Sequence, residues 1–321
     1  MTDMSFDDEI AALLELDVLG LAEEEPRSQE PPSGPVRATA PPPQLRAGTL
    51  ARAVSGRRPG RPVDAAQPCE PAVAFDRTVA DMHDLLRSLA DPEWQAPAHA
   101  EHGRVRELVA HLVGVERLVL RWLDPGDTVP SLPDHIAATL PVVAELAGAE
   151  PRDIARQWHE AARAVALAAG GDRSRPVAWH DFTLSVDQLL VTRTGELWTH
   201  AIDICAATGR PLPRMDMERM ALLCNELLAA VPLAMAYRGT TAPGRSARVV
   251  LTGPAGGTFV VPLAQQPPRA AGPDVTVVAD AVDFCRVAVR RLRPDQLDAA
   301  VEGDRALADL LLGSIDALAR D

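Results

Sequence analysis

A carboxylate and an imidazole with the spacing of metal ligands occur in the second half of the chain, at Glu196 and His200. On a helix, residues four apart project from the same face one turn apart, so both side chains can reach one cation. A catalytic zinc site needs a third protein ligand and leaves a fourth position open. His111 is the candidate for this third ligand, because it lies between Val109 and Leu112 on the predicted inward face of another helix.

The spacing alone leaves other interpretations open. Glu196 and His200 also fit a weak, solvated pair on a helix surface, and a buried histidine such as His111 is more often satisfied by a carbonyl than by a metal. Asp203 either accepts a hydrogen bond from His200 and orients it or pairs with Arg193 or Arg210. The other histidines have no partner at ligand spacing, and we predict no metal role for them: His83, His99, His102, His135, His159 and His180.

Composition narrows the class of protein. The chain has 321 residues, of which 47% are hydrophobic and only 3% aromatic, so its cores must consist mainly of Ala, Leu and Val, as in close-packed helices. The formal charge of −13 argues against nucleic-acid binding. Four scattered cysteines, an acidic N-terminus unlike a secretory signal and no apolar run near the length of a membrane span predict a cytoplasmic protein that does not enter membranes.

The N-terminal region divides into two predicted segments. Residues 1–25 form an acidic amphipathic pattern, typical of a short helix that needs a docking surface. Residues 26–71 are dense in Pro, Gly, Ser and Arg, which predicts a mostly disordered linker. The region therefore suggests a protein partner for residues 1–25 and little folded structure between 26 and 71.

Two folded domains are predicted after the linker. Residues 72–212 show helical periodicity typical of an antiparallel four-helix bundle with loops, and Ser185 with Gln188 has the form of a capping box. Its predicted helices cover 75–89, 104–123, 133–146, 151–169 and 185–209. Residues 213–321 predict a small α+β domain. It has helices at 215–237, 282–292 and 306–319 and strands at 247–252, 258–262 and 275–279.

Two segments of the helical region resemble a known family. RVRELVAHLVGVE (104–116) and TRTGELWTHAIDICAATGRPL (192–212) resemble the mycothiol-dependent maleylpyruvate isomerase family, which belongs to the DinB-like metal-binding bundles. RVVLTGPAGGTFVVPL (248–263) and VEGDRALADLLL (301–312) resemble that family's sterol-carrier-like C-terminal domain. The resemblance covers roughly residues 72–321. It implies a DinB-like antiparallel four-helix bundle followed by a small α+β sterol-carrier-like domain.

The resemblance also implies a chemistry. The family's metal triad falls on His111, Glu196 and His200, and implies zinc or another divalent metal with mycothiol as the thiol cofactor. The activity implied is that of an isomerase or thiol transferase on a small acidic substrate, for instance an unsaturated one. The family's Gly-Arg element falls on Arg290 and Arg291, which makes Arg291 the catalytic candidate for holding a substrate carboxylate. Arg290 replaces the family glycine, and either arginine also fits a surface helix.

A second resemblance concerns the N-terminus. EIAALLELDVLGLAEEE and APPPQLRAGTLARAVSGRRPGR are similar to the start and the exit linker of a zinc anti-sigma domain, but the HisxxxCysxxCys set of such domains is missing between residues 22 and 70. The alternative function is therefore a non-catalytic, anti-sigma-like protein that binds a metal and a regulatory partner. A third interpretation is a two-domain scaffold without a metal.

Overall fold

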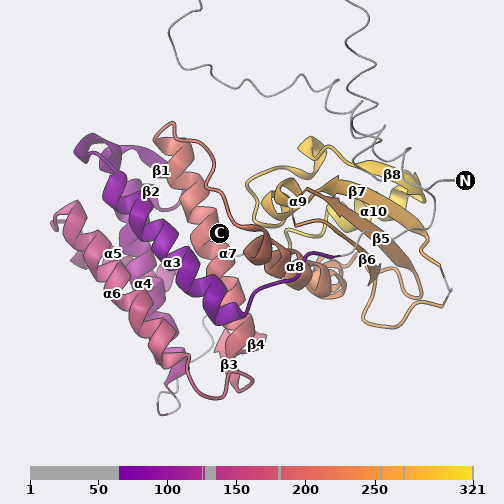
Figure 1. Ribbon diagram of the computed structural model, residues 1–321, viewed down its shortest axis with the longest axis horizontal. Coiled ribbons are helices and arrows are strands. Elements are labelled where there is room, and N and C mark those ends of the chain that lie inside the picture. Colours follow the sequence, from indigo (N-terminus) through magenta and orange to yellow (C-terminus); the bar gives the residue numbers. More distant parts are fainter. Residues whose placement is uncertain are drawn as a thin grey trace, which may run out of the picture. The chain divides into compact units, whose positions relative to one another are not determined.

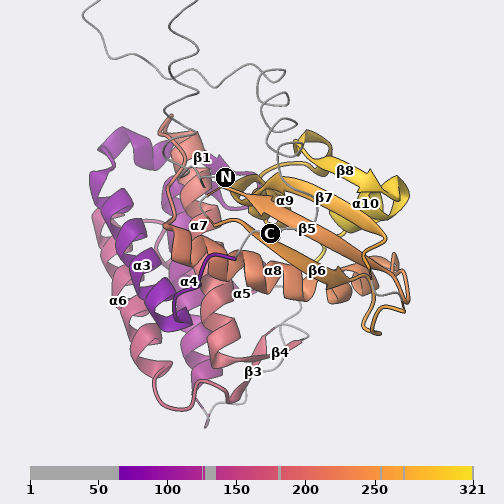
Figure 2. The ribbon, with the colours of Figure 1, turned by 45° about the vertical axis from the view of Figure 1, so that its right-hand side comes forward.

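The computed structural model describes residues 65–124, 126, 135–179, 182–253, 255–269 and 272–319. The predicted segment 1–25 and the predicted linker up to residue 64 lie outside the described residues. All described residues belong to one compact unit, Thr49–Asp321. The structure mixes helices and sheets, as the sequence predicts (Figures 1 and 2).

Five helices form the first half of the described chain, close to their predicted positions. They are α3 (Pro71–Ser88), α4 (Val105–Leu123), α5 (His135–Glu145), α6 (Pro151–Ala168) and α7 (Val186–Ala207). Proline starts α3 and α6, where the missing N–H has no helical partner to lose. The predicted capping box of α7 is confirmed, because Ser185 Oγ accepts from the Gln188 N–H at 3.1 Å and Gln188 Oε1 accepts from the Ser185 N–H at 3.0 Å.

The helices lie side by side around one apolar core (Figure 1). Helix α3 packs against α6 and α7, and α4 packs against α5 and α6. The finer expectation of a DinB-like bundle of four antiparallel helices remains a prediction. Two antiparallel hairpins were not predicted: β1 (Pro97–His99) with β2 (Gly103–Arg104), and β3 (Pro176–Trp179) with β4 (Phe182–Ser185). A 3-10 helix, η1 (Asp91–Gln95), precedes the first of them.

The second half contains a four-stranded sheet with helices. Its elements are α8 (Met217–Arg238), β5 (Ser246–Thr252), β6 (Gly257–Pro262), β7 (Val275–Asp280), α9 (Ala281–Ala288), η2 (Pro294–Gln296), β8 (Ala300–Gly303) and α10 (Arg305–Leu312). The strand order is β6-β5-β7-β8, in which β5 and β7 are parallel and the other pairs antiparallel. The predicted strands 247–252 and 258–262 appear as β5 and β6, which form an antiparallel hairpin, and β8 is an additional edge strand.

Helix α7 contributes to two apolar cores. Leu190 and Leu197 belong to the core of the helical half, whereas Val191, Trp198 and Ile202 belong to the core that α8 and the sheet form. A helix that is apolar on two faces must be covered on both. Helix α7 is therefore packed between the other helices on one face and the sheet domain on the other. This packing fixes the orientation of its side chains.

Helix α8 corrects one expectation from the sequence. Its 22 residues are long and apolar enough, by length and composition, to cross a membrane, so the expectation of no apolar run near that length is wrong. Met220, Cys224, Leu228 and Val231 of this helix are buried in the second core. A core helix of a folded domain meets the same criterion, and the packing of α8 is of that kind.

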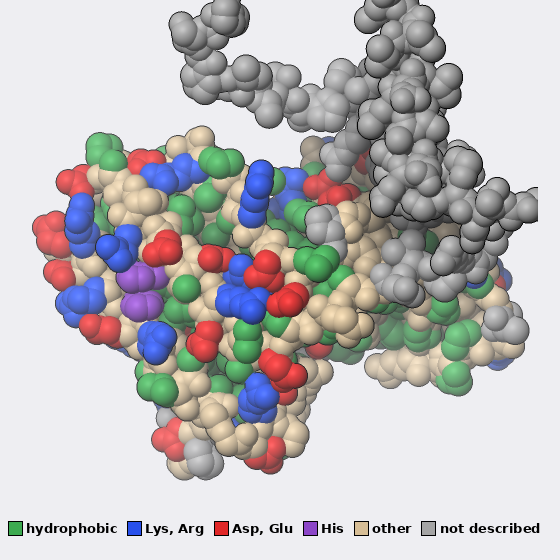
Figure 3. Space-filling view, in the orientation of Figure 1, with side chains coloured by type: hydrophobic (Ala, Val, Ile, Leu, Met, Phe, Trp, Pro, Cys, Tyr) green, Lys and Arg blue, Asp and Glu red, His purple; other side chains and the backbone are tan. Residues whose placement is uncertain are grey.

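On the face drawn in Figure 3, basic and acidic side chains are interspersed.

Candidate metal centre

Three buried histidines converge from different elements. His102 lies in the turn between β1 and β2, His111 on α4 and His200 on α7. One ligand nitrogen from each lies within 4.8 Å of the other two. The rings of His102 and His111 stack with centroids 3.9 Å apart, and the ring of His200 lies edge-on to both, at 5.4 Å and 5.8 Å. The arrangement places three imidazoles around one point.

The proton on His111 is fixed by a hydroxyl. Thr139 Oγ1 donates its proton to the carbonyl of Ile136 at 2.8 Å. The same oxygen therefore accepts a hydrogen bond from His111 Nδ1 at 2.7 Å. His111 then carries its proton on Nδ1 and presents the lone pair of Nε2. Gly114, one turn further along α4, allows this approach, because a Cβ there would lie 2.8 Å from Thr139 Cβ.

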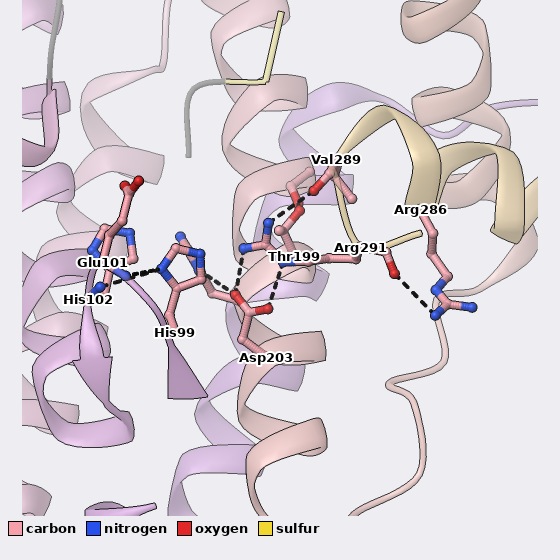
Figure 4. A network of polar contacts seen from close by, with 10 residues as sticks. His99, Glu101, His102, Thr199, Asp203, Arg286, Val289 and Arg291 are labelled. Atoms are coloured by element: carbon pink, nitrogen blue, oxygen red, sulfur yellow. Dashed lines mark hydrogen bonds and ion pairs between the residues drawn. The ribbon is translucent and has the colours of Figure 1, made fainter. Parts of the chain in front are cut away.

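The proton on His200 is fixed by a carboxylate. Asp203 Oδ2 lies 3.1 Å from His200 Nδ1, and Arg291 donates to both oxygens of Asp203, at 2.6 Å from Nε and 2.7 Å from Nη2 (Figure 4). Burial by itself would raise the pKa of Asp203, but the hydrogen bonds from His200 and Arg291 outweigh it and lower that pKa to about 2. Asp203 therefore stays an acceptor, and His200 also presents Nε2.

His99 shapes the turn that carries His102. Its Nδ1 accepts from the backbone N–H of Glu101 at 3.2 Å and of His102 at 3.4 Å (Figure 4). These bonds hold the backbone between β1 and β2 in the conformation that points His102 at His111. His99 thus acts on the turn, whereas His102 belongs to the convergent group.

The donor set fits a divalent cation. Three neutral imidazole nitrogens are the ligand set of a well-known type of zinc site with an open fourth position, and the same ligands suit iron, nickel or copper. Two of the three rings are oriented by hydrogen bonds to Nδ1, as metal-binding histidines usually are. These three residues could therefore hold a metal ion.

Comparisons with known proteins relate one segment of the chain, which is less than half of its length, to a known domain family. Residues 75–205 match the family model described as the mycothiol maleylpyruvate isomerase N-terminal domain. This segment belongs to that domain family. Uncharacterized proteins from two strains of Mycobacterium tuberculosis are 26% identical over 158 residues, which is 47% of this chain and 76% of theirs.

Solved structures agree on the fold. The crystal structure of a mycothiol-dependent maleylpyruvate isomerase matches with a TM-score of 0.52, covering 72% of this chain and 92% of that chain at 16% identity. A histidine-to-alanine mutant of that enzyme matches over the same shares at 16% identity, with a TM-score of 0.50. At this identity the match concerns the fold, and it extends beyond the mycothiol maleylpyruvate isomerase N-terminal domain into the sheet-containing half.

The structure brings together two of the three predicted ligands of this domain. His111 and His200 meet, and the third member of the group is His102, to which the sequence analysis gave no metal role. The side chain of Glu196 forms an ion pair with Arg193, whose other carboxylate partner is Glu116 at 2.7 Å. Nothing in the spacing of His102 indicates its place, because its partners are 9 and 98 residues away along the chain.

Arg291 reaches the site through a tight turn after α9. Arg290, where the family has glycine, adopts φ 57°, in the left-handed region that favours glycine. This ends the helix earlier than the predicted residue 292 and turns Arg291 towards Asp203. The guanidinium also donates to the Val289 carbonyl at 3.1 Å. The geometry therefore favours a positioning role for Arg291 over the predicted role of holding a substrate carboxylate.

We expect Asp203→Asn to weaken zinc binding by about 10- to 100-fold, because loss of the charge makes His200 less basic and orients its ring less firmly. The affinity is measured by competition with a chromophoric chelator. Arg291→Ala should act in the same direction, since it leaves Asp203 less firmly held. Arg293→Ala is the matched control, because Arg293 pairs with the exposed Asp295. Zinc affinity in Asp203→Asn equal to that of the unmodified protein would contradict this role.

Proposed function

We propose that the protein is a cytoplasmic, metal-dependent enzyme that uses a thiol, mycothiol being the candidate, as an isomerase or thiol transferase on a small molecule. The observation that supports it most is the convergence of His102, His111 and His200, two of them with the Nε2 lone pair presented by hydrogen bonding. The match to the mycothiol maleylpyruvate isomerase N-terminal domain supports the thiol.

In this proposal each residue has a defined task. His102, His111 and His200 hold the metal, and zinc is the first candidate because three neutral imidazoles suit it. Asp203, held by Arg291, keeps His200 in its metal-binding tautomer. A metal bound there supplies Lewis acidity, which favours the thiolate form of a thiol. Glu196 remains the alternative third ligand that the sequence predicts.

The substrate is a small molecule bound next to α7. Glu196 and Thr199, which precede His200 on this helix, line a cavity of about 490 Å³. The described charged side chains that line this cavity are glutamates, which oppose the acidic substrate that the resemblance implies. The apolar walls of the cavity would exclude water from a reaction there.

The first test is the metal content of the full-length protein, measured by elemental analysis. We expect about one zinc per chain, because the three histidines form a single site. The double variant His111→Ala, His200→Ala should lose this zinc. Thiol-dependent turnover is then sought with mycothiol and a panel of electrophilic substrates. Absence of metal even after zinc is added back would overturn the proposal. A bound metal without any thiol-dependent turnover would instead leave the non-catalytic, metal-binding protein.

A further inference from the structure

A cavity of about 490 Å³ lies along α7, beside the helix turn that carries His200. Helices α7, α8 and α9, the β3–β4 hairpin and the residues after α10 line it. Its walls are mainly apolar, with Trp179, Trp198, Leu223, Leu227, Leu233 and Ile315 among them. A cavity of this size and composition is typical of a site for a small organic molecule.

The charged side chains that line this cavity, among the described residues, are Glu196 and Glu226, and both are acidic. Glu226 lies on α8, and its described hydrogen-bond partner is the neutral amide of Gln188, at 3.4 Å. Burial raises the pKa of Glu226, and the bond from Gln188 offsets this only in part. An ionised Glu226 is thus poorly solvated and has no cation from the described residues in contact.

Glu196 adds to the negative character of the wall. Its ion-pair partner, Arg193, is fully buried and is shared with a second buried carboxylate, Glu116. One guanidinium is therefore shared by two carboxylates, and Glu226 is a further carboxylate of the lining, without a cation in contact among the described residues. The electrostatic potential in the cavity favours a cation and opposes an anion.

We propose that this cavity binds an apolar molecule that carries a cationic amine. The hydrocarbon part is buried against the leucines and tryptophans, and the ammonium group meets Glu226. Burying a carboxylate costs free energy unless it is paired, and the amine supplies the missing partner of Glu226. A carboxylic acid of the same shape is repelled by both glutamates.

The binding of the amine does not depend on a metal or on a thiol. It rests on the proposed function only in that the cavity lies along α7, the helix that carries His200. A small acidic substrate is then the wrong charge class for this chain, in spite of its resemblance to a maleylpyruvate isomerase. The charge preference can be tested without any enzymatic activity.

The test compares three probes with the same ten-carbon chain: decylamine, which is an ammonium at pH 7, decanol and decanoate. Binding to the full-length protein is followed through tryptophan fluorescence, because Trp179 and Trp198 line the cavity, and through calorimetry, below micellar concentrations. We expect decylamine to bind at least about tenfold more tightly than decanoate. The preference should be the same in protein treated with a chelator, which separates this result from that of the metal analysis.

Variants assign the binding to the cavity. Glu226→Gln should remove most of the preference for decylamine and leave decanol binding unchanged, and it should raise the melting temperature at pH 8, because a poorly solvated charge is lost. Glu218→Gln is the control, since Glu218 lies on the same helix but pairs with exposed Arg77. Ala230→Trp should weaken all three probes by filling the cavity. Equal binding of decanoate, an unchanged preference in Glu226→Gln, or no binding of any probe would overturn the proposal.

Discussion

Replacing His102 by alanine is expected to lower zinc affinity by more than about 100-fold. This loss is larger than that expected when a ligand only loses its hydrogen-bond partner. His102 supplies one of three nitrogens that lie within 4.8 Å of one another, so its loss leaves a two-ligand site. His111→Ala and His200→Ala should have effects of the same size. The dissociation constant is measured by competition with chelators of known affinity on protein freed of metal.

Glu196→Gln separates this ligand set from the one that the sequence predicts. We expect zinc affinity to change by less than about tenfold in this variant, because the Glu196 carboxylate faces Arg193 in an ion pair. His83→Ala controls for the loss of a histidine, since His83 stacks on His159 and is not one of the three convergent histidines. If Glu196→Gln loses the metal and His102→Ala keeps it, the ligands are His111, Glu196 and His200, and the proposed set is wrong.

The helices were predictable because their signals are local. Each of the five predicted helices of residues 72–212 appears within a few residues of its predicted bounds, since apolar periodicity and caps such as Ser185 act over one or two turns. The hairpins and β8 were not predicted, because strands of two to four residues contain too few positions to show alternation. The early end of α9 depends on the backbone of Arg290, for which an arginine gives no signal.

The candidate site shows the same division between local and distant information. His111 and His200 could be found from an inward helix face and a four-residue spacing. Asp203 lies three residues from His200 and was considered as its partner, but its contact with Arg291 spans 88 residues and the alternatives weighed were Arg193 and Arg210. Helical spacing also could not decide whether Glu196 turns towards His200 or towards Arg193, because both neighbours are within one turn.

His102 required tertiary structure to be recognised. It belongs to no helix, and it approaches His111 because the β1–β2 turn, held by His99, folds over the end of α4. A histidine-rich stretch that contains His99 and His102 shortly before a helix with an inward histidine was the available signal. Without the hairpin, this stretch is indistinguishable from a loop with solvated histidines.

Replacing Arg193 by methionine is expected to destabilise the protein by about 3–5 kcal/mol. The side chains of Arg193 and Glu116 are fully buried, and their nitrogen–oxygen contact is 2.7 Å. Burial would lower the pKa of Arg193, but Glu116 and Glu196 outweigh it and raise that pKa. The arginine therefore stays charged, and its removal leaves Glu116 without its buried counter-charge. The free energy of unfolding is measured by denaturant titration of the full-length protein.

The pH dependence of this variant has a defined sign. Burial already raises the pKa of Glu116 in the intact protein, although Arg193 opposes it. Without Arg193 the pKa of Glu116 rises further. In the folded variant Glu116 then keeps a proton at pH values where an unfolded glutamate, with a pKa of about 4.3, has released it. Stability must then fall as pH rises. The deficit of Arg193→Met relative to the unmodified protein should be larger at pH 8 than at pH 5.

A double variant distinguishes loss of the ion pair from loss of packing. Arg193→Met combined with Glu116→Leu removes both charges, and we expect it to recover part of the stability that Arg193→Met loses, because no unpaired charge stays buried. Arg156→Met is the surface control, since Arg156 pairs with exposed Asp153 and Glu160, and such pairs contribute little. If the double variant were no more stable than Arg193→Met at pH 8, the arginine would act through its volume, and the ion pair would not be what holds α4 to α7 beside the metal centre.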